Sequence, residues 1–217
     1  MRIATWNIER LRHKNKLQEI IAECEQANAD ILVLTETDSR VTLNNKSYIS
    51  TTPPDEKNYY NPSETRVTIF TNYEVIERYA TYDEYTAVCV ELKTDKGSLI
   101  VYGTIIGIYG NRHKSYIPDL LSQAKDIERL VKEKNVCVVG DFNCSFADNY
   151  YYTKDGRAAL EDVLIRNDIA LLTRAQPECI DHIAVSNGFA NGLNVETNEW
   201  NLNKTLSDHK GIVVELA

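Results

Sequence analysis

Twice in the chain, an amphipathic helical pattern leads into an uninterrupted apolar run that ends at an acidic side chain. Between Leu17 and Cys24 the apolar residues recur at i, i+3, i+4 and i+7, and "ADILVLTET" follows and ends at Glu36. The same pattern over 120–131 continues into "VCVVGDFN", which ends at Asp141. Continuous apolar strands are typical of sheets covered on both faces. Two halves built alike predict an α/β fold in which two sheets pack face to face with helices outside.

The length of 217 residues suits one sizeable domain. Because no low-complexity segment or Pro/Gly/Ser linker divides the chain, we expect residues 1–217 to form a single domain. A third helix is expected around 157–165. Further strands are predicted at 67–71, 86–92 and 98–106 and in "DIALLT", "IDHIAVS" and "KGIVVEL". The stretches 44–63 and 187–206, rich in Asn, Thr and Pro, are expected to be long surface loops.

The charge of the chain limits the kinds of partner. The formal net charge is -8 and the sequence pI is about 5.1, with Lys and Arg scattered along the chain. A protein that binds nucleic acid through a broad basic face needs clustered Lys and Arg, so this class is disfavoured. A metal-dependent enzyme that meets phosphate through its cation remains compatible with this charge.

The five cysteines are odd in number and never spaced as C-x-x-C, which predicts reduced packing residues and neither a disulfide framework nor a zinc site. The chain begins at once with a strand-like segment, so we expect no signal peptide. No apolar run approaches membrane-spanning length. We therefore expect a cytoplasmic protein, and the sequence indicates no protein partner.

Polar side chains gather at the ends of the apolar runs. They are Asn7, Glu36, Asp141, Asn143, Asp181, Asp208 and His209. Three of these ends are carboxyl ends and two are amino ends, so in a mixed sheet all five meet on one rim. Most of the set are hard oxygen ligands, which suit Mg²⁺ or Mn²⁺ together with water and substrate phosphate. Zinc, which prefers Cys and His, fits poorly.

The motifs "WN", "TE", "GDFN", "IDHI" and "SDH", in this order from Asn7 to His209, resemble those of the endonuclease/exonuclease/phosphatase superfamily. The resemblance implies a four-layer α/β sandwich with two packed mixed β-sheets flanked by helices. It also implies Mg²⁺- or Mn²⁺-dependent hydrolysis of phosphate esters. The layering inferred from the apolar runs agrees with this fold.

The resemblance also implies a metal site. Glu36 is expected to be the principal metal-binding carboxylate, with Asn7 and Asp208 close by. A divalent cation neutralises charge on the phosphoryl group, so positioning and electrostatics do most of the catalytic work.

The remaining motif residues are expected to act on water and phosphate. Asp141 would orient or deprotonate the attacking water, and Asn143 would donate a hydrogen bond to the phosphoryl oxygens or help to place that water. His209 would contact the phosphate, and Asp181 would hold the His209 ring. A carboxylate behind an imidazole fixes its tautomer and favours its cationic form.

The sequence departs from the family pattern at one point. The family usually carries a His or Tyr after the strand that reads "LIVYGTIIGIYGN" here, and Thr104 and Ile105 occupy that region. Neither side chain replaces a histidine. Tyr102, Tyr109 and His113 are the candidates for the missing group, and the sequence does not choose among them.

Three residues are candidates for substrate binding: Tyr109, Tyr102 and Arg66. Arg66 could meet a phosphate, although a structural role at the start of its strand is the simpler interpretation. The cluster at 150–152 could stack on nucleobases, line a pocket for an apolar substrate group or pack on the surface. His182 alternates to the opposite face from Asp181 and is expected to be structural.

The favoured function is hydrolysis of phosphodiester bonds in DNA or RNA, in an endo- or exonuclease-like manner. A phosphatase or phosphodiesterase for a small molecule or lipid headgroup is the alternative, because the charge is acidic and the chain is short for the family. A catalytically silent binding module on the same fold is the third hypothesis. The missing His or Tyr near Thr104 supports it, and the otherwise intact acids argue against it.

Overall fold

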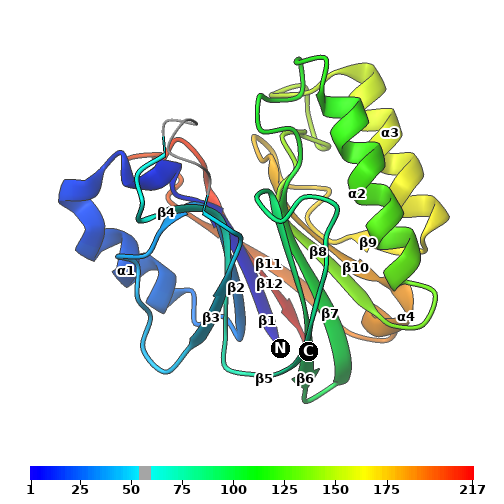
Figure 1. The fold of residues 1–217 in the computed structure, drawn as a ribbon, viewed down its shortest axis with the longest axis horizontal. Helices are drawn as coiled ribbons and strands as arrows, with labels where there is room; N and C mark the ends of the chain where they lie inside the picture. Colours follow the sequence, from blue (N-terminus) through cyan, green and yellow to red (C-terminus); the bar gives the residue numbers. More distant parts are fainter. Residues whose placement is uncertain (54–59) are drawn as a thin grey trace.

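The computed structural model describes residues 1–53 and 60–217, so residues 54–59, within the predicted loop 44–63, lie outside the described residues. Two six-stranded sheets face each other (Figure 1). The first has the order β11-β12-β1-β2-β4-β3, with strands at Val195–Trp200, Gly211–Leu216, Arg2–Asn7, Ile31–Asp38, Glu64–Thr71 and Ser47–Ser50. The second has the order β5-β6-β7-β8-β10-β9, with strands at Glu74–Tyr79, Ala87–Thr94, Gly97–Ile105, Val136–Asp141, Asp181–Ser186 and Ile169–Leu171.

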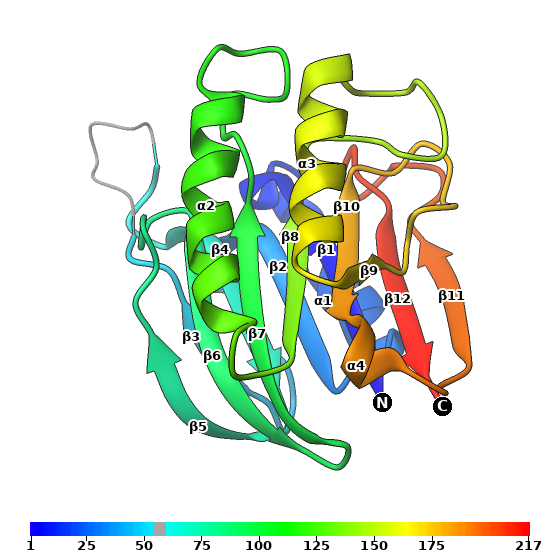
Figure 2. The ribbon, with the colours of Figure 1, turned by 90° about the vertical axis from the view of Figure 1, so that its right-hand side faces the viewer.

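Helices cover the outer faces of both sheets. Helix α1 (Leu17–Gln26) lies on the first sheet, and α2 (Tyr116–Leu130) and α3 (Lys154–Arg166) lie side by side on the second (Figure 2). Helix α4 (Asn187–Ala190) is short, as are the 3-10 turns η1 (Glu9–Leu11) and η2 (Lys14–Lys16). The predicted four-layer α/β sandwich is confirmed.

The space between the sheets is filled by the inward side of each apolar strand. Val33 and Val67 from the first sheet pack in one cluster with Val139 and Ile183 from the second. Because side chains alternate along a strand, the other side of each run packs beneath the helices. This is why the strands read as continuous apolar runs.

One glycine fixes the end of β8. Gly140 has φ 138°, and a Cβ atom there would lie 2.0 Å from the main-chain oxygen of Thr104 on the parallel neighbour β7. Any larger residue would push the two strands apart. Gly140 therefore lets Asp141 end β8 while still in register with β7.

Two predicted loops were wrong in part. The stretch 44–63 contains β3, and 187–206 contains α4 and β11; β5 was not expected either. All three strands are sheet edges, with one neighbour each. Their side chains are largely exposed, so their sequences lack the apolar pattern that marks a strand.

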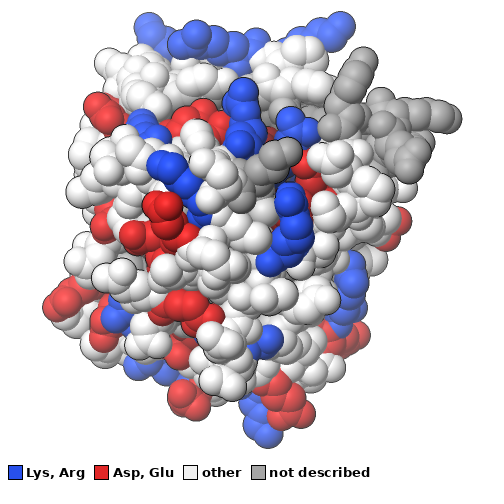
Figure 3. Space-filling model, turned by 90° about the vertical axis from the view of Figure 1, so that its left-hand side faces the viewer, with Lys and Arg blue, Asp and Glu red and all other residues white. Residues whose placement is uncertain are grey.

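The five cysteines are free and buried, as expected. None of the helices in the described part of the chain combines the length and apolar composition needed to cross a membrane. On the face shown in Figure 3, basic and acidic side chains are interspersed, and the described residues form no continuous basic stripe there.

Candidate active site

The strand ends that carry the polar motifs meet at the upper end of the sandwich in Figure 1. Strands β1 and β2 are parallel, so Asn7 pairs with Thr35, next to Glu36. Strand β10 runs antiparallel to β8 and pairs Asp181 with Asp141. The turn before β12 brings in the Ser-Asp-His motif, because β12 is antiparallel to β1.

Asp141 lies at the centre of this group and is 3% exposed. Its Oδ2 accepts a hydrogen bond from the Asn7 amide at 3.1 Å, and its Oδ1 accepts one from the main-chain N–H of Asn143 at 2.8 Å. Burial raises the pKa of Asp141 to about 7, and the charge of Asp181 adds to the rise. A carboxylate that titrates near neutrality is suited to accept a proton from water.

Asn143 has a left-handed backbone, with φ 49°. Its Nδ2 donates to the main-chain oxygens of Ile106 at 3.2 Å and Gly107 at 3.3 Å. Both amide hydrogens therefore have acceptors, and the side-chain carbonyl oxygen remains for the pocket that Asn143 lines. This arrangement favours the second expected role, in which Asn143 helps to place a water molecule.

His209 is held by Asp181. The distance from His209 Nδ1 to Asp181 Oδ2 is 2.5 Å, and both side chains are largely buried. Burial on its own would lower the pKa of His209, but the charge and hydrogen bond of Asp181 outweigh it and raise the pKa to about 10. His209 is therefore cationic at neutral pH, and its other ring nitrogen, Nε2, lies 3.6 Å from Asp208 Oδ1.

The turn before β12 is fixed by contacts with β1. Ser207 donates from Oγ to the main-chain oxygen of Asn7 at 2.6 Å and accepts the N–H of His209 at 3.1 Å. The Trp6 indole donates to the main-chain oxygen of His209 at 3.0 Å. These hydrogen bonds hold the Ser-Asp-His turn against β1.

Glu36 interrupts β2. Its φ is 43°, which removes one pair from the β2–β4 register and turns its side chain toward the other acids. Burial raises the pKa of Glu36; the charges of Arg10 and His209 oppose the rise, and those of Glu9 and Asp208 add to it. Glu36 and Asp208 thus lie in one acidic field with exposed oxygens, since their side chains are 34% and 70% exposed.

Sequence reasoning missed two residues beside Glu36. Glu9 is 8% exposed, and its Oε2 accepts the main-chain N–H of Asp208 at 2.9 Å. Arg10 lies 4.0 Å from Glu36, measured from Nε to Oε2. Their signal was an acid and a base two and three residues after the Asn of "WN". Nothing in the sequence indicates the left-handed turn from Glu9 to Leu11, with φ of 47°, 53° and 53°, that directs them here.

The donor set fits a divalent cation. Asp141, Asp181 and His209 have ligand-type atoms within 4.8 Å of one another, and Asp181 Oδ1 is buried with no hydrogen-bond partner among the described residues. A cationic His209 cannot ligate, which leaves carboxylate oxygens as the donors, including those of Glu36 and Asp208 beside the ring. These are the ligands that Mg²⁺ or Mn²⁺ prefers.

A pocket of about 340 Å³ opens beside His209. Tyr150, Tyr151 and Lys204 line it together with Asn143. Lys204 Nζ donates to the Tyr150 hydroxyl at 2.9 Å and lies 4.5 Å from the centre of that ring. The pocket therefore joins Asn143, Asp181 and His209 to a wall of aromatic and cationic side chains.

The structure excludes one of the three candidates for the missing family residue. Tyr102 is fully buried beneath α2, where its hydroxyl donates to Asp126 at 3.2 Å, so the expectation that it contacts substrate is wrong. Thr104 also faces α2 and donates to Gln123 at 2.6 Å. Tyr109 is 69% exposed and packs on His113, with ring centres 5.0 Å apart, outside the pocket. A substrate role for Tyr109 stays a prediction.

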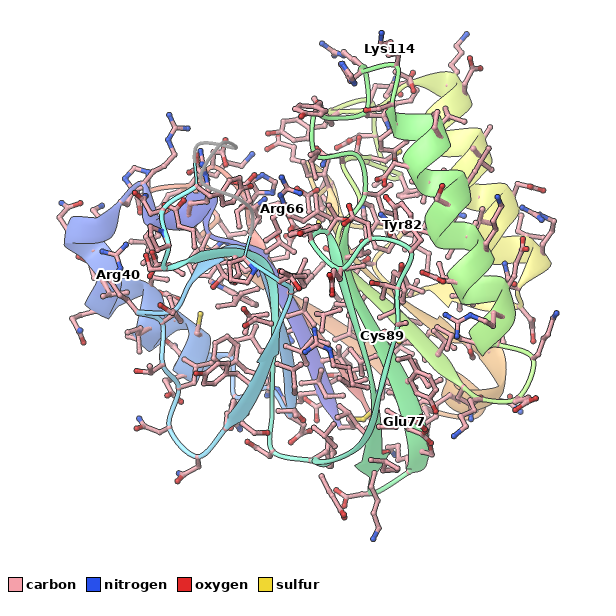
Figure 4. The ribbon with its side chains drawn as sticks, in the orientation of Figure 1. Arg40, Arg66, Glu77, Tyr82, Cys89 and Lys114 are labelled. Carbon is pink, nitrogen blue, oxygen red and sulfur yellow. The ribbon has the colours of Figure 1, made fainter. Side chains whose placement is uncertain are left out.

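His182 and Arg66 have different environments. His182 is fully buried and bridges Thr173 to the main-chain oxygen of Cys144, which supports the expected structural role. Arg66 on β4 points into the space between the upper ends of the sheets (Figure 4). It is 8% exposed, and its Nε lies 3.4 Å from the Tyr60 hydroxyl.

Comparisons with known proteins agree with this geometry. The model of the Endonuclease/Exonuclease/phosphatase family matches residues 4–209. AP endonuclease LMAP from Leishmania major is similar in structure, with a TM-score of 0.74 and 15% identity over 98% of this chain and 86% of that chain. The 3′ phosphatase NExo from Neisseria, bound to a product DNA hairpin, has a TM-score of 0.73 and 15% identity over 100% and 99%. No curated protein sequence matches the chain significantly.

Proposed function

The chain belongs to the endonuclease/exonuclease/phosphatase family, and we propose that it hydrolyses phosphodiester bonds with the help of a divalent cation. One observation carries the proposal. A carboxylate whose pKa lies near neutrality, Asp141, shares a buried site with a cationic imidazole, His209, which a second carboxylate, Asp181, holds in place. This is a proton acceptor beside an anion-stabilising group, as hydrolysis of a phosphate ester requires.

In the proposed reaction, water attacks phosphorus in line with the leaving oxygen. Asp141, oriented by Asn7, accepts the proton as the water oxygen bonds to phosphorus. The bond from phosphorus to the leaving oxygen breaks, and that oxygen takes a proton from solvent. His209 donates from Nε2 to a non-bridging oxygen, where negative charge builds up. Asn143 accepts a hydrogen bond from the attacking water through its side-chain oxygen.

Glu36 is the proposed principal ligand for the cation, with Asp208 beside it and Asn7 close by. When bound, a divalent cation neutralises charge on the phosphoryl oxygens and supports the leaving group. Glu9 acts as a positioning residue, because it holds the main chain of Asp208.

Nucleic acid is the proposed substrate. Structural neighbours include an AP endonuclease and a 3′ phosphatase bound to DNA, and the aromatic and cationic wall formed by Tyr150, Tyr151 and Lys204 suits a nucleotide. A small phosphoester is the second candidate, favoured by the net charge of -8. The silent binding module is disfavoured, because a site without chemistry has no physical need to bury Asp141 and Asp181 together.

The test is hydrolysis of a panel with Mg²⁺ or Mn²⁺, before and after chelation. The panel holds plasmid DNA, oligonucleotides with and without an abasic site, RNA, bis-p-nitrophenyl phosphate and phosphomonoesters. We expect activity that chelation and Asp141→Asn abolish. Calorimetry should show that Glu36→Gln weakens Mn²⁺ binding about tenfold or more, because a charged ligand is lost.

Glu77→Gln is the matched control, since Glu77 is an exposed glutamate at the opposite end of the molecule (Figure 4). Folded protein that binds no Mn²⁺ and hydrolyses nothing would refute the proposal and favour the silent module. Binding that weakens steeply with salt would assign the substrate to nucleic acid, and salt-insensitive turnover would assign it to a small phosphoester.

A further inference from the structure

We propose that Arg66 and Arg10, separated by Tyr60, form a second anion site that binds the phosphoryl group next to the one cleaved. The inference rests on the proposed hydrolysis, because it places this site beside the same catalytic group. In this proposal, Arg66 and Arg10 select substrates that carry at least two consecutive phosphoryl groups.

Arg66 is a buried cation, and within the described part of the chain its charge acts on Asp119 without forming an ion pair. It is 8% exposed, and among residues 1–53 and 60–217 no ion pair joins it to a carboxylate. Its hydrogen bond is the contact of 3.4 Å with the Tyr60 hydroxyl, and its guanidinium lies 5.2 Å from the Tyr60 ring centre. Arginine is rarely buried without an anionic partner, because desolvating its charge is costly. An anionic ligand would supply the missing partner.

Arg66 faces the substrate side of the molecule. It lies on β4 opposite Glu36, at the point where β2 loses one pair of its register. Burial raises the pKa of Asp119 at the start of α2, and the charge of Arg66 opposes that rise. The charge of Arg66 therefore reaches across the space between the sheets, where a substrate chain would enter.

Arg10 completes the site from the other side of Tyr60. Its guanidinium lies 4.8 Å from the Tyr60 ring centre, so the ring is contacted by two arginines. Arg10 also lies 4.0 Å from Glu36 and 3.8 Å from Glu64. Arg10 belongs to the left-handed turn of three non-glycine residues, and such strained backbone is retained where ligands are clamped.

A second pocket continues outward from this point. It has a volume of about 590 Å³, and Arg10, Arg12 and Arg40 line it. Arg12 pairs with Glu9 and Arg40 pairs with Asp38, so the charge of each is partly balanced, as the charge of Arg10 is by Glu36 and Glu64. A phosphate chain cleaved at His209 would thus pass Arg66 and Arg10 and then leave over this pocket.

The test compares the thymidylates TpT and TpTpT, which carry one and two phosphates. We expect wild type to prefer TpTpT in kcat/KM, and Arg66→Gln and Arg10→Gln each to reduce that preference about tenfold or more, the effect of losing one charge-assisted hydrogen bond. Arg166→Gln, which removes an arginine paired with Glu128 and Asp162 on the outer helices, is the matched control.

Fructose 1,6-bisphosphate and fructose 6-phosphate, used as inhibitors, distinguish the sources of the second phosphoryl group. Selective inhibition by the bisphosphate, lost in Arg66→Gln, assigns the site to small bisphosphates, and preference for TpTpT without such inhibition assigns it to a nucleic-acid strand. Equal losses on TpT and TpTpT, or an unchanged preference, would overturn the inference.

Binding separates this inference from the proposed hydrolysis. If wild type cleaves neither thymidylate, the proposed function fails, and calorimetric titration still decides on the second anion site. Tighter binding of TpTpT than of TpT, abolished in Arg66→Gln, supports the site, and equal binding refutes it. Arg10, whose side chain is 33% exposed, carries the test if Arg66→Gln does not fold.

Discussion

At the scale of single residues, the candidate site depends on the contact of 2.5 Å between His209 and Asp181. Asp181 is 1% exposed, and its charge is the main force that keeps the buried His209 ring protonated. A buried carboxylate in this position orients the imidazole and stabilises its cation without changing its own protonation. The contact therefore both orients the His209 ring and keeps it protonated. A substitution that keeps the shape of Asp181 but removes its charge separates these two effects.

Asp181→Asn should lower kcat by about 100-fold or more while the protein stays folded, because the amide keeps the shape but not the charge. The pKa of His209 should fall below its value of about 10, which NMR titration of the ring measures. Asp162→Asn, on the exposed side of α3, is the control. An unchanged pKa together with unchanged kcat would show that Asp181 does not support His209.

The residues of this site could be predicted better than their roles. The sequence predicts Asp141, Asp181 and His209 because each one ends or precedes an apolar run. The strand order then brings these strand ends together. The hydrogen bonds of Asn143 and the missing strand pair at Glu36 could not be predicted, because both depend on left-handed backbone that non-glycine residues seldom adopt.

At the scale of elements, β10 is tied to the segment after β8 through His182. The carbonyl oxygen of Cys144 can only accept, so His182 Nε2 donates to it at 2.9 Å, and Nδ1 lies 2.8 Å from the Thr173 hydroxyl oxygen. Burial lowers the pKa of His182 from 6.5 to about 4, so the ring is neutral at pH 7 and its Nδ1 accepts from the Thr173 hydroxyl. The anchor holds the segment that follows Asp141.

This anchor predicts a loss of stability in mild acid. Between about pH 6.5 and pH 4 the unfolded chain binds a proton at His182 that the folded chain does not, so the free energy of unfolding falls as pH falls. The loss from this group should reach about 3 kcal/mol at pH 4. Urea unfolding at pH 7, 5.5 and 4.5 measures it. His182→Gln should be less stable at pH 7 but lose less on acidification; equal slopes for both proteins would contradict the prediction.

The elements that could not be predicted share a physical cause. Central strands such as β2 and β8 are covered on both faces, so apolar composition identifies them. The edge strands β3, β5 and β11 have one neighbour each and expose much of their length, so polar residues can occupy most of their positions. These strands pair with a sheet that is already formed, so no local sequence pattern predicts them.

At the scale of the whole molecule, the two sheets share one core. Side chains from both sheets, including Val33 and Val139, belong to a single buried cluster. The chain ends also meet, since the amino group of Met1 donates to the main-chain oxygen of Leu216 at 2.9 Å. Neither sheet buries its inner face without the other, which is the physical reason to expect residues 1–217 to be one domain.

This shared core predicts a single cooperative unfolding transition. Trp6 on β1 and Trp200 on β11 report on the first sheet by fluorescence, whereas circular dichroism also follows α2 and α3 on the second. The two signals should change at the same denaturant concentration.

A destabilising substitution in one sheet should then lower the stability of the other sheet as well. Val139→Ala, on β8 in the second sheet, should lower the free energy of unfolding by about 2 kcal/mol, because it removes buried methyl groups, and should shift the tryptophan signal as much as the circular dichroism. Ile165→Ala, on the exposed side of α3 where the side chain is 74% exposed, should change neither signal by more than about 0.5 kcal/mol. If Val139→Ala moved the circular dichroism but left the tryptophan transition in place, the sheets would unfold separately and residues 1–217 would not be one domain.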